Sequence, residues 1–436
     1  MEKYNEFRDT GLPWVEKIPK GWKLVKIKYV LKERIEKNNP MKTENILSLT
    51  AKQGVVPYDQ KEGGGNKPKE DVTNYKLAYP GDIVINSMNI LSGSTGLSHY
   101  FGCVSPVYYM LYPYDGDVRY YSYIFLDEAF QKSLYGLGNG IQIKESSNGK
   151  LNTIRMRIPM DKLSSLRIPV PMVLEQKAIA DYLDDKCKSI DTLVIGLEKQ
   201  LEEIQHFKRE LIANIITKGM NKTVSMKDSD VDWMGNIPKH WNVTKLKWMF
   251  EIVKRIYGAE DRDVLSITQR GIKIKDIDIN DGQMAESYAN YQVVNVNDFA
   301  MNSMDLLTGW VDCSPYEGVT SPDYRVFRFH PDKPQCHTYY KYLFQMCYTN
   351  RVFYRLGQGV SNLGRWRLQA DQFLNIRLPQ PPIEEQEQIA AYLDTRVGQI
   401  EELTADIKAQ IEKQKEYRKI VIHDAVTGKI KVTEGE

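Results

Sequence analysis

The stretch EQKAIADYL at residues 175–183 returns 210 residues later as EQEQIAAYL at residues 385–393. Each copy follows a proline-rich stretch, with Pro169 and Pro171 before the first and Pro379, Pro381 and Pro382 before the second. Few glycines and no proline interrupt residues 172–217 or 383–427. Because proline is tolerated at the start of a helix but not in its interior, each copy predicts the first turns of a helix. Each helix should run about 40 residues, or roughly 60 Å.

Apolar residues recur along both segments in alternating steps of four and three, the 3.5-residue period of a coiled-coil seam. The predicted seam consists of Ile179, Leu183, Ile190, Leu193, Leu197, Ile204, Phe207 and Leu211, and of Ile389, Leu393, Ile400, Leu403, Ile407, Tyr417 and Val421. Polar residues interrupt the seam at the same repeat positions in both helices: Lys186 corresponds to Arg396, and Gln200 corresponds to Gln410. Such residues can fix the register of a pair. We expect the two helices to pair antiparallel within one chain; a homodimeric coiled coil is the alternative.

The repetition extends over the whole half-chain, and such repeats decide the architecture. WVEKIPKGWKLVKIKYV (14–30) matches WMGNIPKHWNVTKLKWM (233–249), and Asn86-Ser87-Met88 matches Asn302-Ser303-Met304. Ser105-Pro106 corresponds to Ser321-Pro322, and Leu137-Gly138 to Leu356-Gly357. Four blocks in the same order indicate a tandem duplication.

The first part of each half combines short β-branched and aromatic runs, such as DIVIN (82–86) and VYYMLYP (107–113), with Gly, Asn and Pro breaks. The predicted fold class is therefore α+β, with two tandem mixed α/β domains, each followed by a long helix. The expected segments are a first domain at 1–172, a helix and linker at 173–227, a second domain at 228–382, and a helix and tail at 383–436.

Composition narrows the class of protein. The 436 residues are 42% hydrophobic and 27% charged, typical of a globular protein. No apolar run approaches the roughly 18 residues of a membrane span, and MEKYNEFRDTGLPW lacks the apolar core of a signal peptide. Five scattered cysteines, without a C-x-x-C pair, favour reduced thiols in a cytoplasmic protein. The net charge of +2 does not by itself indicate a nucleic-acid partner, so any DNA affinity must come from local patches or from partner subunits.

A search for catalytic motifs finds none. The sequence has no G-x-x-x-x-G-K-[ST] phosphate loop, no metal-ligand spacing among its six histidines, and no amino-methyltransferase or nuclease motif. GNGIQ (138–142) and GQGVS (357–361) read as glycine-rich turns. We therefore expect no catalytic residue, no metal and no cofactor in this chain.

A basic stretch follows each glycine-rich turn at the same place in the repeat. KESSNGKLNTIRMR (144–157) and TNRVFYRLGQGVSNLGRWR (349–367) supply guanidinium and ammonium groups that can hold phosphates or read guanine, and amides that can read adenine. A third loop, DQKEGGGNKPK (59–69), adds three lysines, Lys61, Lys67 and Lys69, of which the last two are candidates. The candidate DNA-binding residues are Lys67, Lys69, Asn139, Gln142, Lys144, Asn148, Lys150, Arg155, Arg157, Arg351, Arg355, Gln358, Asn362, Arg365 and Arg367. For any single one of these residues, a solvated surface position without a DNA contact is an equally good interpretation.

The chain resembles the DNA-specificity subunit of type I restriction-modification systems. The resemblance rests on IPKGW (18–22) with IPKHW (237–241), GDIVINSMN (81–89) with NDFAMNSMD (297–305), FGCVSPVYYML (101–111) with EGVTSPDYRVF (317–327), and RIPVP…EQKAIADYLD (167–184) with RLPQPP…EQEQIAAYLD (377–394). It covers nearly the whole chain. It implies two target-recognition domains on double-stranded DNA, each reading half of a bipartite target, with the helices as a spacer.

The resemblance also implies partners. These are two modification subunits, which use S-adenosylmethionine, and restriction subunits, which use ATP and Mg²⁺; the present chain would catalyse nothing. Two other hypotheses remain open at this point. One is a coiled-coil scaffold with protein-binding ends, and the other is a single-chain nuclease or methyltransferase.

Overall fold

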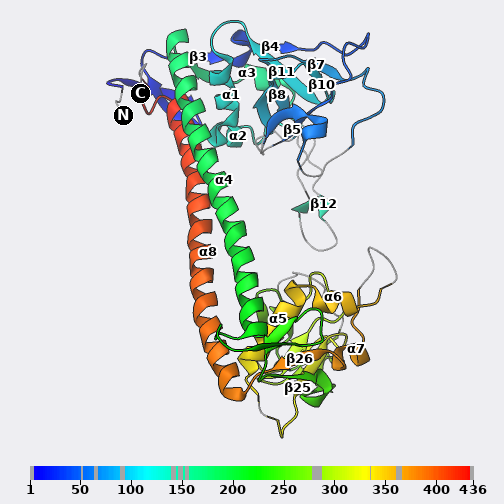
Figure 1. Ribbon diagram of the computed structural model, residues 1–436. Helices are drawn as coiled ribbons and strands as arrows, with labels where there is room; N and C mark the ends of the chain where they lie inside the picture. Colours follow the sequence, from blue (N-terminus) through cyan, green and yellow to red (C-terminus); the bar gives the residue numbers. More distant parts are fainter. Residues whose placement is uncertain are drawn as a thin grey trace. The chain divides into compact units, whose positions relative to one another are not determined.

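A computed structural model of the chain describes residues 4–50, 53–62, 67–88, 94–138, 144–145, 151–152, 157–276, 287–333, 335–359 and 366–432. The chain forms two compact units, which Figure 1 shows as ribbons. Unit 1 comprises residues 1–198 and 409–436, and unit 2 comprises residues 199–408. Two long helices, α4 (Val173–Lys218) and α8 (Ile383–Val426), each contribute one part to each unit.

The shorter elements of unit 1 are β1 (Phe7–Leu12), β2 (Val15–Pro19), β3 (Lys23–Lys26), η1 (Ile27–Tyr29), β4 (Leu31–Arg34), β5 (Leu47–Thr50), β6 (Gly54–Pro57), η2 (Tyr58–Gln60), β7 (Lys76–Ala78), β8 (Ile83–Asn86), β9 (Thr95–Leu97), β10 (Gly102–Val104), β11 (Tyr108–Pro113), α1 (Val118–Leu126), α2 (Glu128–Ser133), β12 (Lys144–Glu145), β13 (Leu151–Asn152), α3 (Met160–Ser165) and β14 (Arg167–Val170).

Those of unit 2 are β15 (Met226–Asp228), β16 (Asn236–Pro238), β17 (Asn242–Lys245), η4 (Leu246–Trp248), β18 (Phe250–Val253), β19 (Leu265–Thr268), β20 (Gly271–Ile274), β21 (Gln292–Val294), β22 (Phe299–Met301), β23 (Val311–Cys313), β24 (Gly318–Thr320), β25 (Arg325–Phe329), α5 (His337–Thr349), α6 (Val352–Leu356), α7 (Ala370–Leu374) and β26 (Arg377–Gln380).

The same sheet topology occurs in both units. A four-stranded antiparallel sheet has the order β4-β11-β8-β9 in unit 1 and β18-β25-β22-β23 in unit 2. A separate antiparallel pair joins the strand after the Ile-Pro-Lys motif to the strand before each long helix, as β3 with β14 and β17 with β26. The predicted α+β class and the tandem repeat are confirmed.

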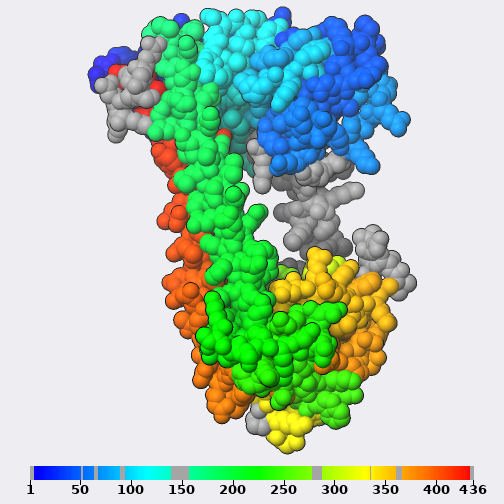
Figure 2. All heavy atoms as spheres, viewed as in Figure 1, coloured from blue at the N-terminus to red at the C-terminus, as the bar shows by residue number. Residues whose placement is uncertain are grey.

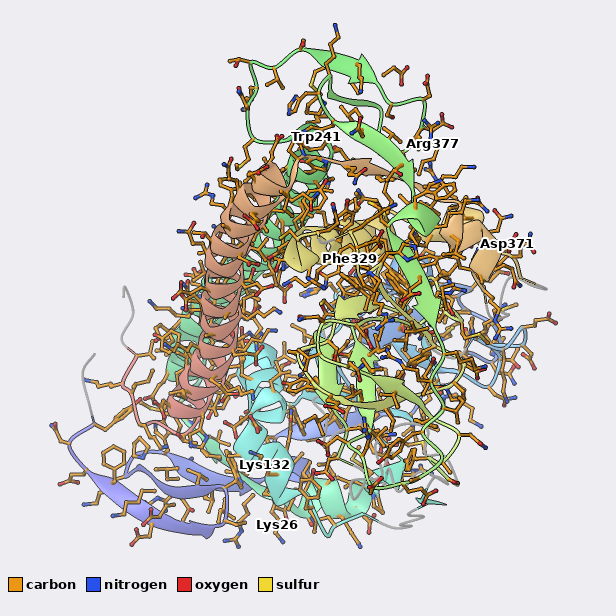
Figure 3. The ribbon with its side chains drawn as sticks, turned by 90° about the horizontal axis from the view of Figure 1, so that it is seen from below. Lys26, Lys132, Trp241, Phe329, Asp371 and Arg377 are labelled. Atoms are coloured by element: carbon orange, nitrogen blue, oxygen red, sulfur yellow. The ribbon has the colours of Figure 1, made fainter. Side chains whose placement is uncertain are left out.

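The central strands are buried on both faces, which explains their continuous apolar sequence. Successive strand side chains point to opposite faces. In unit 1, Ile83 and Ile85 of β8 enter the main core, whereas Val84 joins a smaller core on the other face. In unit 2 the main core is aromatic: Phe250 packs its ring 4.3 Å from that of Phe329, which Figure 3 labels.

The two long helices run antiparallel in each unit. In unit 1, Arg418 pairs with Asp191 at 2.9 Å and Lys415 with Glu198 at 3.6 Å. In unit 2, Lys208 pairs with Glu401 at 2.6 Å, and Gln205 donates to Thr404. Residue numbers therefore rise on one helix as they fall on the other. Intrachain antiparallel pairing is confirmed, and at 46 and 44 residues the helices are slightly longer than expected.

Four of the fifteen predicted apolar seam residues lie one position away from the residue that faces the seam. Ile190, Leu197 and Ile204 on α4, and Leu393, Ile400, Ile407 and Val421 on α8, are buried or half-buried as expected. The prediction was wrong for Leu193, Phe207, Leu403 and Tyr417, because their side chains are 46–53% exposed. Figure 2 shows the flank of α8, coloured orange to red, open on the viewed face.

At each misplaced position, the next residue in the sequence faces the seam instead. These residues are Val194, Leu201 and Lys208 on α4, and Thr404, Ile411 and Arg418 on α8. The supposed polar interruptions Lys186, Gln200, Arg396 and Gln410 are exposed, so they lie outside the seam. Lys208 and Arg418 hold partly buried stems against the partner helix while their charges meet Glu401 and Asp191. Charged residues, Lys208 and Arg418, therefore face the seam where the apolar residues before them, Phe207 and Tyr417, were predicted to do so.

A buried glutamine at the start of each long helix joins that helix to its domain. Gln176 accepts a hydrogen bond from the Asp117 amide at the start of α1 and donates to the Pro171 carbonyl. Gln386 accepts from the Cys336 amide at the start of α5 and donates to the Pro381 carbonyl. Both side chains are at most 2% exposed. They thus satisfy helix-end donors that burial would otherwise leave unpaired.

Candidate nucleic-acid interface

Each predicted basic stretch contains a short antiparallel pairing. In unit 1, Lys144 and Glu145 of β12 pair with Asn152 and Leu151 of β13. In unit 2, the Gln358 amide donates to the Arg367 carbonyl at 2.9 Å, and the Arg367 amide donates back at 3.0 Å. Both basic stretches therefore contain a paired segment, but the two pairings lie at different points of the repeat, because Gln358 and Arg367 correspond to Asn139 and Arg157 and not to residues of β12 and β13.

The base of each loop is anchored to the Asn-Ser-Met motif. The Ile158 amide donates to the Ser87 carbonyl in unit 1, and the Leu368 amide donates to the Ser303 carbonyl in unit 2, both at 3.1 Å. The loop base in each unit is therefore built into the domain core.

In each unit, one side chain of a central strand donates a hydrogen bond to the base of the loop. This side chain is a tyrosine in unit 1 and an arginine in unit 2. Tyr109 donates to the Ile158 carbonyl at 3.0 Å, whereas Arg325 donates to the Leu368 carbonyl at 2.8 Å. Arg325 lies over the ring of Phe373, and burial lowers its pKa to about 10, which leaves it charged at neutral pH. Arg325 therefore places a half-buried positive charge at the base of the second loop.

The predicted DNA-binding residues whose side chains the structure describes are all on the surface. Arg157, Arg351, Arg355, Gln358, Arg367, Lys67 and Lys69 are exposed. Arg367 donates to the sulfur of Met304 and lies 3.9 Å from Asp323. Lys144 lies in β12. Asn139, Gln142, Asn148, Lys150, Arg155, Asn362 and Arg365 fall outside the described residues, so the central part of both loops stays a prediction.

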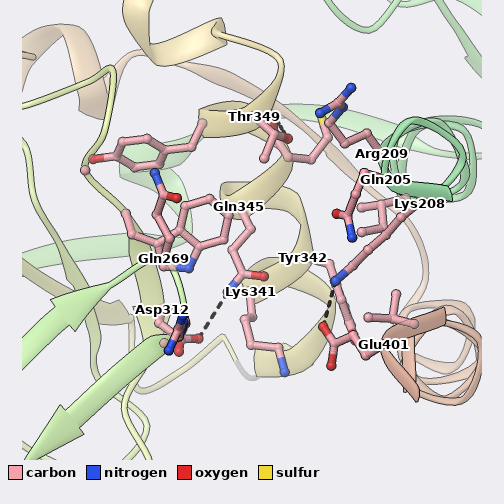
Figure 4. Close-up of a pocket in the computed structure, with 18 of the residues that line it drawn as sticks. Gln205, Lys208, Arg209, Gln269, Asp312, Lys341, Tyr342, Gln345, Thr349 and Glu401 are labelled. Atoms are coloured by element: carbon pink, nitrogen blue, oxygen red, sulfur yellow. Dashed lines mark hydrogen bonds and ion pairs between the residues drawn. The ribbon is translucent and has the colours of Figure 1, made fainter. Parts of the chain in front are cut away.

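A cleft of about 760 Å³ lies in unit 2 between the domain and the two helices. Figure 4 shows Lys208 and Gln205 of α4 on one side, with Gln345 and Asp312 on the other. Of the predicted residues, Arg351 lines this cleft. Burial raises the pKa of the half-buried Asp312 carboxyl, which accepts a hydrogen bond from the Ile272 amide.

The described residues contain no group of three or more His, Cys, Asp or Glu side chains placed to hold a metal ion. Within the same part of the chain, none of the helices has the length and apolar character that a bilayer crossing requires.

Comparison with known proteins identifies the repeated architecture. The family described as "Type I restriction modification DNA specificity domain" matches the chain twice, over residues 19–203 and 238–413. The chain belongs to this family. Both matched segments contain an Asn-Ser-Met anchor, a basic loop and the first part of a long helix, so the specificity-domain family accounts for the duplication.

Two curated relatives come from Methanocaldococcus jannaschii. The type I restriction enzyme MjaVIII specificity subunit is 26% identical over 62% of this chain, and the chain spans 63% of that relative's length. The putative type I restriction enzyme MjaX specificity subunit is 25% identical over 84% of this chain and 81% of the relative.

Solved structures share the fold. A chain from work on complex assembly and conformational transition of the type I R-M system superposes with a TM-score of 0.67, at 10% identity, over 95% of this chain and 99% of that chain. The HsdS subunit from Thermoanaerobacter tengcongensis superposes with a TM-score of 0.50, at 12% identity, over 95% and 98%. At these identities the likeness concerns the fold alone.

Residues that the sequence analysis missed in this specificity-domain protein connect the domains to the helices. The indole of Trp22 donates to Glu175 at 3.1 Å, and that of Trp241 donates to Glu385 at 2.9 Å. Tyr120 donates to the Val426 carbonyl in unit 1, and Tyr339 donates to the Ile216 carbonyl in unit 2. All these residues occupy matched positions of the repeat, so the offset itself was a signal that could have found them.

Proposed function

We propose that this chain is the sequence-reading subunit of a type I restriction-modification complex, in which each domain reads one half of a bipartite duplex target. The observation that carries the proposal is the matched pair of loops. Both are basic in sequence, the side chains described at their ends are exposed, and both are anchored through the same backbone contact to Ser87 or Ser303. A rigid base that carries a basic loop suits base-specific reading, because rigid scaffolds commonly position binding loops.

The two loops differ in sequence and in the side chain beneath them, Tyr109 against Arg325. We therefore expect the two half-sites to differ. The helix pair acts as the spacer, and two linked readers gain affinity through effective concentration when the spacer matches the distance between half-sites.

Catalysis belongs to partner subunits in this proposal. Two modification subunits would supply the S-adenosylmethionine site, and restriction subunits would use ATP and Mg²⁺. A target adenine must leave the base stack for methylation, with an unstacking cost of a few kcal/mol, so we expect the bound DNA to be distorted.

Exposed apolar side chains on the long helices support a protein partner there. Leu193 and Phe207 on α4 occupy the same repeat positions as Leu403 and Tyr417 on α8, and all four are exposed. Exposed apolar surface that gathers into a patch marks a protein interface. Their duplication fits two copies of one partner.

Gel-shift titration of the chain with its modification subunits tests the proposal. Methylome sequencing of a host that carries the system first identifies a bipartite methylated motif, and that motif defines the target duplex. We expect the target to bind more tightly than a duplex with either half-site scrambled. Equal affinity for all three duplexes would leave the scaffold hypothesis standing. Binding of S-adenosylmethionine by the chain alone would instead favour a methyltransferase.

A further inference from the structure

Three arginines in unit 2 line the cleft without a neutralising partner. Arg209 comes from α4, Arg270 from the turn between β19 and β20, and Arg351 from the position before α6. All three arginines are exposed. In the part of the chain that the structure describes, no acidic side chain lies within ion-pair distance of any of them. Figure 4 shows Arg209 facing Thr349 at the end of α5.

The acidic groups of the cleft are already engaged by other residues. Glu401 pairs with Lys208 at 2.6 Å, and Asp394 accepts from the Tyr342 hydroxyl at 2.8 Å. Asp312 accepts hydrogen bonds from Gln345 and from two backbone amides. The three guanidinium groups therefore retain their hydrogen-bonding capacity toward a ligand.

The repeat provides an internal comparison. The positions of Arg209 and Arg351 correspond to Lys419 and Lys132 in unit 1. Both lysines pair with Glu128, at 3.0 and 2.6 Å, and these contacts lower the pKa of that carboxyl. At the position of Glu128, unit 2 has the buried Cys347. Unit 2 thus keeps both cations and lacks the acid that neutralises them.

We infer that this cleft binds phosphate groups of the DNA backbone, independently of base sequence, beside the second recognition domain. Arginine suits this task because its planar fork donates two parallel hydrogen bonds to a phosphate. Gln205, Gln269 and Thr349 line the same cleft and add neutral donors. The inference rests on the proposed function, and it adds an interaction that fixes position without reading sequence.

Salt-dependent duplex binding tests the inference. The full-length chain, assembled with its modification subunits, is titrated with a target duplex and with a scrambled duplex at several salt concentrations. For the Arg209→Gln/Arg351→Gln variant we expect the slope of log K against log salt to fall by about 0.9 for each phosphate that is no longer neutralised. Both duplexes should weaken by the same factor, about tenfold at moderate salt, which leaves the target preference unchanged.

The matched control is Lys132→Gln/Lys419→Gln, which removes two cations at the same repeat positions in unit 1. Its slope should stay at the wild-type value. A common slope for wild type and the arginine variant would overturn the inference, whereas equal wild-type binding of both duplexes would overturn the proposed function instead.

Two further measurements separate other ligands from duplex DNA. Calorimetric titration with magnesium-free ATP tests a free nucleotide as the source of the phosphate. If ATP binding disappears in the arginine variant while duplex binding is intact, the DNA assignment is overturned in favour of a nucleotide site. If the variant instead fails to bind its modification subunits and otherwise keeps the wild-type slope, the cleft is a protein-binding surface and the inference fails.

Discussion

At the scale of single residues, the buried glutamines have consequences that can be measured. Gln386 satisfies the Cys336 amide at the start of α5. The Gln386→Leu variant leaves that buried donor unpaired, so we expect the free energy of unfolding to fall by about 1–3 kcal/mol. Urea denaturation of the full chain measures the change. Gln410→Leu, at an exposed position on α8, is the control and should change stability by less than about 0.5 kcal/mol.

The arginines of the second loop carry a separate prediction about DNA. We expect Arg365→Ala and Arg367→Ala each to weaken binding to the second half-site by roughly 1–3 kcal/mol if they contact bases. Competition gel shifts with duplexes altered in one half-site at a time measure the effect. Arg328→Ala, an exposed arginine paired with Glu251 on the neighbouring strand, serves as the control. Wild-type affinity in both loop variants would remove these residues from the interface.

The sequence predicted where the loops and the long helices begin, but not which buried residues anchor them to the domains. Lysines and arginines after a glycine-rich turn are visible in the sequence, and the described ones are exposed. The roles of Gln176 and Ser87 were hidden, because a polar residue in a sequence fits equally well on a surface or at a buried backbone group. Only the packing of α1 and β8 against neighbouring segments decides that Gln176 and Ser87 are buried.

At the scale of elements, the helix pair shows how far hydrophobic periodicity can be trusted. The period and the helices were predicted correctly, yet Leu193, Phe207, Leu403 and Tyr417 were each one residue away from the position that faces the seam. The apolar pattern placed Leu403 in the seam, but the side chain that is buried there is that of the neighbouring Thr404. Periodicity could not have shown this, because the Lys208–Glu401 ion pair allows a charged residue to occupy a facing position.

A pair of alanine substitutions tests this corrected seam. Ile407 is 3% exposed and Leu403 is 47% exposed, although both are large apolar residues on α8. We expect Ile407→Ala to destabilise the chain by about 2–4 kcal/mol through the cavity that it leaves. Leu403→Ala should cost less than about 1 kcal/mol. Chemical denaturation of the full chain makes the comparison, and similar losses of stability for both variants would restore the original seam.

At the scale of the whole molecule, the proposed spacer role predicts the effect of changing helix length. A seven-residue insertion at matched positions of α4 and α8 keeps the seam in phase and adds about 10 Å. Since base pairs stack about 3.4 Å apart, the unread spacer of the target should grow by about three base pairs. Methylome sequencing of cells that carry the altered chain measures the spacer. An insertion in α4 alone should destroy pairing and activity, and an unchanged spacer after matched insertion would contradict the proposal.

The composition of unit 1 has a consequence for the order in which the protein is made. Val421, Ile422, Ala425 and Val426 of α8 belong to the same core as Trp14, Trp22 and Ile18. The ribosome therefore completes residues 1–198 well before it supplies residues 409–432. At about 5–20 residues per second, this interval lasts roughly 10–40 s. During synthesis, the first domain must wait with part of its apolar surface uncovered until the whole of the second unit has been made.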